Sequence, residues 1–292
     1  MTLPALAEAL RRHVEYLAGE IGERNVFHPQ ALQAAENYLA QTWHDLGLEV
    51  QRQVYEAKGV ASANLEVTLP GRTWPHEIVL LGAHYDSVQG SPGANDNGSG
   101  VAVLLALSQL LQSFSLPRTV RLVAFVNEEP PFFFTSKQGS RQYAKMARAR
   151  GDNIRLMLSL ETMGYYCDRP GCQRYPPLFR FFYPATGHFI GFVTCFKYRR
   201  QLRRLTHLFR AVCDFPVEQA AAFAWIPGVA WSDHLSFWRY GYPGIMVTDT
   251  ALFRYPWYHH PEDTPDKLDY TRLARVTEGL ASAIHQLTVE GI

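Results

Sequence analysis

"EIVLLGAHYDSVQGSPGANDNGSGVAVLLALSQLL", residues 77–111, joins two apolar segments through a glycine-rich stretch. The first segment is short, continuous and rich in Ile, Val and Leu, which is typical of a strand covered on both faces. A helical apolar pattern then spans residues 99–114, and a second short apolar run spans residues 119–129. This part of the chain therefore predicts a strand–helix–strand unit.

The rest of the chain repeats this alternation. Helices are expected at residues 3–22, 30–46, 140–150 and 270–289, with a further basic helix near 197–204; strands are expected at 48–57, 62–71, 154–164, 189–196 and 243–251. Alternating helices and buried strands imply a three-layer α/β/α fold with a largely parallel, mixed central sheet. No repeat, low-complexity segment or linker interrupts the pattern, so residues 1–292 are expected to form a single domain with the N-terminal helices packed on it.

Composition excludes several classes of protein. Hydrophobic residues make up 47% of the 292 residues and charged residues 19%, as in an ordinary globular protein. Lys and Arg number 28 against 27 Asp and Glu, without a sustained basic run, so no nucleic-acid partner is expected. No apolar run is long enough to suggest a membrane span. The N-terminus lacks the apolar core of a signal peptide, so a cytoplasmic location is the default expectation, with secretion left open.

The four cysteines are too few to build a disulfide scaffold. Cys167 and Cys172 flank the turn sequence "DRPG", which leaves a local disulfide open in an oxidising compartment. Cys195 and Cys213 stand among apolar neighbours and are expected to be free thiols.

Polar side chains that suit a metal stand where the expected strands end. His84 and Asp86 close the first strand, Glu128 and Glu129 the second, and Glu161 the third. In open α/β sheets, ligands bind at the carboxyl edge of the strands. Two adjacent glutamates after a buried strand are costly to bury without cations, because like charges raise each other's pKa.

Two further stretches supply matching groups. Asp96 lies in the glycine-rich stretch, and the late loop "WYHHPEDTPDKLDY" carries His259 and His260. Zinc binds histidine nitrogen and carboxylate oxygen readily, and cysteine is absent from these positions, which argues against a structural zinc. Taken singly, each position is equally compatible with a polar turn or a solvated loop.

Five short motifs together resemble a known family. In chain order they are H-x-D, N-D-N-G-S-G, N-E-E, L-E-T-M-G and Y-H-H-P-E-D-T, between residues 84 and 264. This ordered set is similar to that of the co-catalytic dizinc aminopeptidases of clan MH, whose relatives include glutamate carboxypeptidases and the single-zinc glutaminyl cyclases. The resemblance implies a zinc-exopeptidase-like fold.

The resemblance also implies two Zn²⁺ ions per chain that share one carboxylate. Asp96 would bridge both ions. His84 and Glu161 would complete one site, and Glu129 and His259 the other. Glu161 departs from the pattern, because many family members have the shorter aspartate there.

Catalytic roles follow from the same resemblance. Glu128 would be the general base, Asp86 the partner that orients the first metal-binding histidine, and Tyr258 a residue that helps hold the oxyanion. His259 is preferred to His260 because the family histidine stands four residues before the acidic residue of its D-T pair.

Two neighbouring stretches are less specific. "SDHLSFW" resembles a family segment near the site, which makes Asp233 a candidate supporting residue, whereas His234 is not expected to bind metal. The phenylalanines at 132–134 either wall a side-chain pocket or pack as an ordinary loop.

The function expected from the sequence is zinc-dependent removal of N-terminal residues from peptides that have a free N-terminus. Two alternatives stay open: a single-zinc glutaminyl-peptide cyclotransferase and a non-catalytic peptide-binding relative. The number of bound zinc ions separates the two enzymes.

Overall fold

The computed structural model describes residues 1–291 and contains an eight-stranded sheet. The strands are β1 (Gln51–Ala57), β2 (Val60–Leu69), β3 (Trp74–His84), β4 (Arg118–Phe125), β5 (Asn153–Glu161), β6 (Ile190–Cys195), β7 (Val217–Ala222) and β8 (Gly244–Thr248). Their order across the sheet is β1-β2-β4-β3-β5-β8-β6-β7. The central pairs β4–β3, β3–β5 and β5–β8 are parallel, as is β6–β7, and the remaining three pairs are antiparallel.

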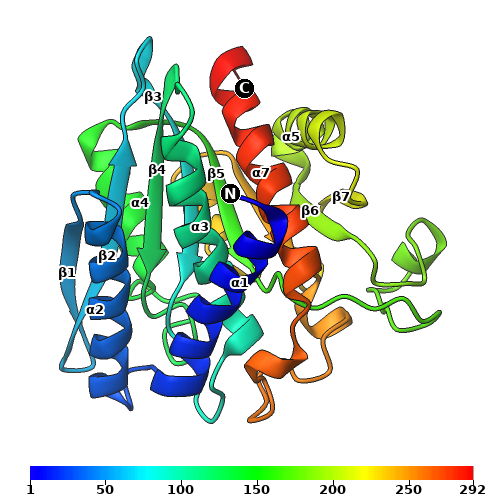
Figure 1. The fold of residues 1–292 in the computed structure, drawn as a ribbon, viewed down its shortest axis with the longest axis horizontal. Helices are drawn as coiled ribbons and strands as arrows, with labels where there is room; N and C mark the ends of the chain where they lie inside the picture. The colour runs from blue at the N-terminus through cyan, green and yellow to red at the C-terminus, as the bar shows by residue number, and fades with distance from the viewer. Residues whose placement is uncertain (292) are drawn as a thin grey trace.

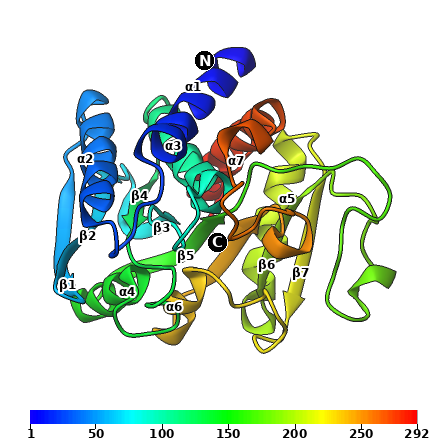
Figure 2. The same ribbon diagram turned by 90° about the horizontal axis from the view of Figure 1, so that it is seen from below.

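Helices cover both faces of this sheet (Figures 1 and 2). They are α1 (Leu3–Val14), α2 (Pro29–Asp45), α3 (Gly100–Gln112), α4 (Gly139–Arg150), α5 (Arg199–Val212), α6 (His234–Arg239) and α7 (Tyr270–Glu290). Figure 2 shows α4 and α6 on one face and the other helices on the opposite face. The predicted three-layer α/β fold is confirmed.

Strand β3 shows why its sequence is continuously apolar. Val79 and Leu81 belong to the core under α1, α3 and α7, whereas Ile78 and Leu80 belong to a second core under α4. Because successive side chains point to opposite faces of a strand, a strand covered on both sides needs apolar residues at every position.

The N-terminal helices are part of the larger core. Helix α1 packs against α3 and α7, and its Leu6 and Leu10 are buried there together with Leu287 near the end of the chain. No helix within residues 1–291 is both long enough and apolar enough to cross a membrane.

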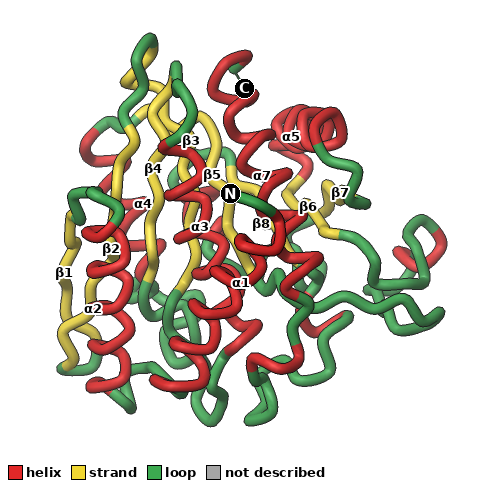
Figure 3. The backbone as a smooth tube through the Cα atoms, viewed as in Figure 1, coloured by secondary structure: helices red, strands yellow, loops and turns green. Residues whose placement is uncertain are grey.

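Two features of the segment after β5 bear on the site. Cys167 and Cys172 form a disulfide, one of the two possibilities that the sequence left open. The chain between β5 and β6 is mostly irregular and projects beyond the β6–β7 end of the sheet (Figure 3). The edge strand β7 was not predicted, because "VEQAAA" has one β-branched residue, Val217, and no aromatic residue, whereas strands favour both.

Candidate metal centre

Neighbouring strands deliver the candidate side chains to one edge of the sheet. His84 and Glu161 are the last residues of β3 and β5, and Glu128 and Glu129 follow β4 after two residues. These three strands are adjacent in the order β4-β3-β5 and run parallel, so their carboxyl ends meet. Asp96 lies in the segment Ala94–Ser99 that leads into α3, where its own backbone is not helical (φ −110°, ψ 89°).

Asp96 stands between two imidazoles. Its Oδ1 is 3.3 Å from Nε2 of His84, and its Oδ2 is 3.1 Å from Nε2 of His259. One glutamate lies close to the same nitrogen of each imidazole: Oε2 of Glu161 is 3.5 Å from Nε2 of His84, and Oε1 of Glu129 is 3.4 Å from Nε2 of His259. The five residues expected to hold two ions thus form one continuous cluster, with Asp96 at its centre.

Three overlapping groups have their donor atoms within 4.8 Å of one another: His84–Asp96–Glu161, Asp96–Glu129–His259 and His84–Glu128–Glu129. The first two are the sets implied by the motif resemblance. The third brings Glu128 within the same space, as a base beside the metal ligands requires.

Several donor atoms in the cluster have no hydrogen-bond partner. They are Nε2 of His84, both carboxylate oxygens of Asp96 and Oε1 of Glu129, all of them buried. Buried polar atoms are normally satisfied, so each exception calls for an explanation. Nitrogen and carboxylate oxygen form a donor set that suits zinc, and the orphaned atoms point into the cluster. The residues present therefore fit a metal ion.

Charge in the cluster supports the same conclusion. Burial raises the pKa of Glu128 well above its usual value, and burial and the nearby Asp96 raise that of Glu129 to about 8. Burial opposes ionisation of Asp96 too, but the adjacent imidazoles of His259 and His84 outweigh it and lower its pKa. Four carboxylates and two imidazoles share a space from which water is largely excluded, and bound cations would offset the excess negative charge.

Asp86 contacts three residues of the cluster, namely Glu128, Glu129 and His84. Its Oδ1 accepts a hydrogen bond from the backbone N–H of Glu128, and its Oδ2 accepts one from that of Glu129, both at 3.1 Å. Nδ1 of His84 lies 3.1 Å from the backbone carbonyl oxygen of Asp86, which is its hydrogen-bond partner, and 3.5 Å from Oδ1 of the same residue. An acceptor at the second nitrogen of a metal-binding histidine fixes its orientation and tautomer, and Asp86 supplies it here through its carbonyl group, with its carboxylate close by.

Asp263 holds the backbone around Asp96 in a similar way. Its carboxylate accepts hydrogen bonds from the backbone N–H groups of Asn95 (2.8 Å) and Asp96 (3.1 Å), and from the hydroxyl of Tyr255 (2.7 Å). No role was predicted for Asp263, which served only as the acidic residue of the D-T pair four positions after His259. The signal that could have indicated its role is its place in the same motif.

Arg24 supports the loop from the other side and was not predicted. Its guanidinium is fully buried and donates to the carbonyl oxygens of Tyr85 (2.7 Å) and Gly93 (2.9 Å), as well as to those of Leu17, Gly22 and Pro92. The loop between β3 and α3, which carries Asp86 and Asp96, is thereby attached to the N-terminal segment. Only the folded chain brings these groups together, so no local pattern could reveal them.

The remaining predicted residues lie around the cluster. Tyr258 stacks on His259, with ring centroids 4.0 Å apart. His260 points to solvent and pairs with Glu262, so the geometry favours the other histidine of the pair. The hydroxyl of Ser232 donates to Oε2 of Glu161 at 2.8 Å.

The two candidate residues of the "SDHLSFW" segment have different surroundings. Asp233 is fully buried without a hydrogen-bond partner, and burial raises its pKa to about 7. His234 lies with its Nε2 2.8 Å from the carbonyl oxygen of Val229 and belongs to none of the metal-binding groups. The phenylalanines at 132–134 do not line the apolar pocket beside the cluster, so the pocket-wall alternative is wrong for that pocket.

Comparisons with known proteins agree with this geometry. A family model described as peptidase family M28 matches residues 64–284. The uncharacterized protein YfbL of Escherichia coli is 34% identical over 291 residues, which cover 96% of this chain and 88% of YfbL. The probable aminopeptidase YDR415C of Saccharomyces cerevisiae is 26% identical over 238 residues. This alignment covers 76% of this chain but only 56% of the yeast protein.

Solved structures share the fold. A zinc aminopeptidase of Bacillus subtilis, BSAP, superposes with a TM-score of 0.75 at 16% identity, covering 98% of this chain and 96% of BSAP. The glutaminyl cyclase of Fimbriiglobus ruber gives a TM-score of 0.69 at 18% identity, with 96% and 94% covered. The family model spans most of the chain and includes all five residues of the two imidazole–carboxylate groups: His84, Asp96, Glu129, Glu161 and His259. The chain belongs to peptidase family M28.

Proposed function

We propose that the protein is a zinc-dependent exopeptidase that removes N-terminal residues from peptides. The observation that carries the proposal is the position of Asp96, whose two carboxylate oxygens lie near the Nε2 atoms of two different histidines, each of which also has a glutamate oxygen within 3.5 Å. One carboxylate shared by two donor sets is what holds two cations close together in two-metal hydrolases. The aminopeptidase names among the relatives support the same activity.

We assign two zinc ions to the cluster. One would be held by His84, Asp96 and Glu161, and the other by Asp96, Glu129 and His259. Bound zinc supplies two kinds of chemistry in such a site: it lowers the pKa of water and polarises a carbonyl oxygen.

Glu128 is the residue that moves the proton. Its backbone N–H is held by Asp86, and its Oε1 accepts a hydrogen bond from Nε2 of Gln138 at 3.3 Å. Burial raises its pKa, and a base is most effective when its pKa approaches the working pH. In the proposed reaction Glu128 takes a proton from the attacking water and returns it to the leaving amine.

The same carboxylates recognise the substrate. A free α-amine is positively charged at neutral pH and is attracted to an edge where Glu128, Glu129 and Glu161 converge. Tyr258, stacked on His259, is placed to donate its hydroxyl to the oxyanion that forms on the scissile carbonyl.

A glutaminyl cyclase is the second candidate, because Asp96, Glu129 and His259 alone form a complete three-donor set and cyclases share the fold. Metal content separates the two proposals. Purified protein saturated with zinc should contain about two ions per chain and hydrolyse aminoacyl-4-nitroanilides. One ion per chain together with cyclisation of an N-terminal glutamine would favour the cyclase.

The two-ion assignment has a matched pair of variants. His259→Ala removes a donor from one set only, so the protein should lose about half of its zinc and nearly all of its activity. His260→Ala alters the exposed neighbour and should change neither. Activity of the wild-type protein should disappear with a chelator and return with added Zn²⁺; peptidase activity that resists chelation would contradict the proposal.

A further inference from the structure

One stretch of the chain carries positive charge without negative charge. Residues 169–213 contain nine of the 28 Lys and Arg residues of the protein and none of its 27 Asp and Glu residues. Eight of these nine residues are exposed. Within residues 1–291, the ninth, Arg204, is the one member of the set that forms a salt bridge, with Glu290. The other eight therefore face solvent without a carboxylate partner in that part of the chain.

The projecting segment between β5 and β6 belongs to this stretch and has an apolar tip. Leu178, Phe181 and Phe182 are 69%, 68% and 81% exposed, respectively. The guanidinium of Arg180 lies 4.9 Å from the centre of the Phe181 ring, so positive charge and aromatic surface are in contact at the tip. Apolar side chains that gather at one exposed place mark an interaction site.

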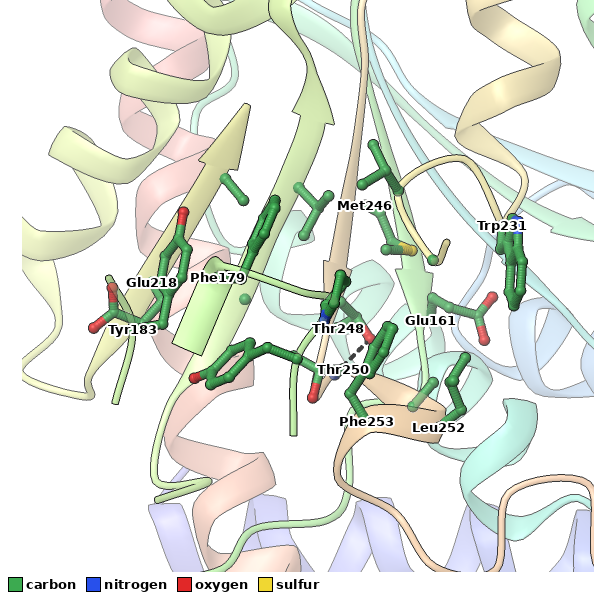
Figure 4. Close-up of a pocket in the computed structure, with 18 of the residues that line it drawn as sticks. Glu161, Phe179, Tyr183, Glu218, Trp231, Met246, Thr248, Thr250, Leu252 and Phe253 are labelled. Atoms are coloured by element: carbon green, nitrogen blue, oxygen red, sulfur yellow. Dashed lines mark hydrogen bonds between the residues drawn. The ribbon is translucent and has the colours of Figure 1, made fainter. Parts of the chain in front are cut away.

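The same segment is attached to the sheet by rings that face inward. Phe179 and Tyr183 stack on each other, with ring centroids 5.8 Å apart, and help to form the wall of the apolar pocket beside the metal centre. Figure 4 shows both residues near Glu218 of the edge strand β7. The Tyr183 hydroxyl donates to the carbonyl oxygen of Gln219 on the same strand at 2.9 Å. These contacts hold the segment against β7 and leave its apolar tip on the outer side.

A second exposed group of aromatic rings lies where β6 and β7 end. Phe196 follows β6 directly and Phe223 follows β7 directly, and the two strands are parallel neighbours. The ring centroids of Phe196 and Phe223 are 4.8 Å apart, and the ring of Trp225 stacks on that of Phe223 at 5.8 Å. All three side chains are exposed, Trp225 by 77%. They therefore contact one another at the surface instead of entering the core.

Basic residues border this second group. Helix α5 begins at Arg199, three residues after Phe196, and Nη1 of Arg199 donates to the carbonyl oxygen of Phe196 at 3.1 Å. Lys197, Arg200 and Arg203 are exposed in the same short part of the chain. Cations and aromatic rings are thus neighbours here, as they are at the tip of the projecting segment.

The two apolar groups lie at the same end of the molecule. Figures 1 and 2 show the projecting segment beside β7. It meets this strand at Gln219, and Phe223 follows four residues later, which is about 13 Å along a strand. We call this region the basic aromatic surface. It comprises the tip at residues 178–182, the rings of Phe196, Phe223 and Trp225, and the basic residues within 197–203.

We infer that the basic aromatic surface binds an anionic lipid bilayer. Phe, Trp and Leu side chains enter the boundary between lipid headgroups and acyl chains, whereas Lys and Arg stay at the level of the headgroups. Each Lys or Arg near an anionic membrane surface strengthens binding by about five-fold. A surface that carries both kinds of side chain matches the two layers that a bilayer presents. Such attachment does not require the proposed peptidase activity.

Three features favour a bilayer over other partners. Leu178 is aliphatic, so it can insert among acyl chains but cannot stack on a nucleic-acid base. The exposed rings lie on a projection and at strand ends, and none of them lines the apolar pocket, whereas single-stranded nucleic acid follows a groove. A second copy of the protein would bring two positively charged surfaces together, which opposes a dimer through this surface.

Sedimentation with vesicles measures this binding. The full-length protein should bind vesicles made of phosphatidylglycerol and phosphatidylcholine in equal parts, and should bind pure phosphatidylcholine vesicles at least roughly 10-fold more weakly. Binding should weaken between about 0.1 M and about 0.5 M NaCl, because salt screens the attraction between exposed charges. Absence of binding to the anionic vesicles, or equal binding to both kinds, would overturn the inference.

Removal of the exposed rings tests insertion into the bilayer. Phe181→Ser combined with Phe182→Ser should weaken binding to the anionic vesicles by about 10-fold or more, because each buried methylene equivalent strengthens binding by about four-fold. Val54→Ser is the matched control: Val54 is 65% exposed on β1, at the opposite edge of the sheet, so binding should not change. Phe182→Ser alone keeps the test valid if the double variant does not fold. Wild-type affinity in a folded variant would contradict the inference.

Removal of charge tests the cations of the surface. Arg199→Gln combined with Arg200→Gln should weaken binding by about 25-fold at low salt, since each arginine contributes about five-fold. Arg11→Gln combined with Arg12→Gln removes the same charge from exposed positions on α1 and should have a much smaller effect. An equal loss in both double variants would show that net charge, and not this surface, attracts the protein to the vesicles.

Trp225 provides a signal that distinguishes a bilayer from other partners. Anionic vesicles with brominated acyl chains should quench part of the tryptophan fluorescence of the protein, and Trp225→Phe should lose most of this quenching. If the vesicles bind without quenching and a single-stranded oligothymidylate binds as tightly, the surface recognises polyanions and the inference is wrong. If gel filtration shows a dimer that Phe181→Ser combined with Phe182→Ser dissociates, the surface belongs to a contact between two copies, which also contradicts the inference.

Discussion

Two adjacent glutamates of the same size have different surroundings at the site. Oε1 of Glu129 is buried without a hydrogen-bond partner and lies 3.4 Å from the imidazole of His259. Oε1 of Glu128 accepts a hydrogen bond from Gln138, and Glu128 belongs to neither of the two groups that contain Asp96. The geometry therefore favours Glu129 as a metal ligand and Glu128 as the base. A single substitution at each position tests this assignment.

The Glu128→Gln variant should bind as much zinc as the wild-type protein but have a much lower kcat. The amide preserves size and hydrogen-bonding reach but cannot take a proton, so kcat should fall by about 10²–10⁴-fold, the usual contribution of a positioned base. Glu129→Gln should lose zinc affinity as well as rate, because a neutral amide is a poor zinc ligand. Metal analysis measures the zinc content of both variants, and steady-state kinetics measures their kcat.

The pH profile adds a second readout for the same pair. Wild-type kcat should rise with pH as Glu128 ionises in the enzyme–substrate complex, and this rise should be absent from Glu128→Gln. Near-normal turnover in Glu128→Gln would eliminate it as the base. Loss of zinc from Glu128→Gln but not from Glu129→Gln would mean that the two residues have exchanged roles.

The loop between β3 and α3 depends on a segment of the chain that lies outside the residues matched by the family model. We refer to this loop, which carries Asp86 and Asp96, as the metal loop. That model begins at residue 64, whereas Arg24 precedes α2 and donates to carbonyl oxygens on both sides of the loop between β3 and α3. Ser87 in the loop reinforces the link, because its N–H donates to the carbonyl oxygen of Arg24 at 2.9 Å. The N-terminal segment thus helps to position Asp86 and Asp96.

Arg24→Lys should weaken both the fold and the metal centre. Lysine keeps the charge but has a single nitrogen, so it cannot replace the planar fork that reaches several carbonyl groups at once. Buried carbonyl groups left without a donor should lower the free energy of unfolding by roughly 2 kcal/mol or more. Thermal melts of the metal-free protein and zinc titrations of the folded protein measure the two effects.

Arg12→Lys, an exposed substitution on α1, is the control for Arg24→Lys and should match the wild type in both measurements. If Arg24→Lys keeps the wild-type zinc affinity, the arginine stabilises the fold without positioning the metal loop.

Local patterns predicted most elements and the cluster, but not the groups that support it. The continuous apolar runs of β3, β4 and β5 predicted a sheet with helices on both faces. The polar residues that follow these runs lie at the carboxyl edge of that sheet. Strand β7 escaped detection because its residues are weak strand formers held by pairing with β6. Arg24 is 61 residues from its acceptor at Tyr85, a contact that no local period encodes. The pocket walls escaped for the same reason, since the loops that build them have no regular pattern.

The buried charged groups of the cluster link metal binding to the stability of the folded protein against unfolding. Burial raises the pKa of Glu129 from 4.5 to about 8. Burial opposes the charged form of His259, but the adjacent carboxylates of Asp96 and Glu129 outweigh it and raise its pKa from 6.5 to about 10. Between pH 6.5 and 9 the metal-free folded protein therefore holds more protons than the unfolded chain.

The stability of the metal-free protein should consequently fall as pH rises through this window. Both groups have a higher pKa in the folded state than in the unfolded chain, so their contribution is present at the lower pH and is lost as each folded-state pKa is passed. Zinc should remove most of this dependence, because the cation takes the place of the protons among the carboxylates and binds only the folded state. Melting temperatures at pH 6.5, 7.5 and 9, with chelator and with added Zn²⁺, test the argument: the two curves should diverge as pH rises. Parallel curves would show that the cluster does not exchange protons for metal, and Glu129→Gln, which removes one of the two titrating groups, should reduce the divergence.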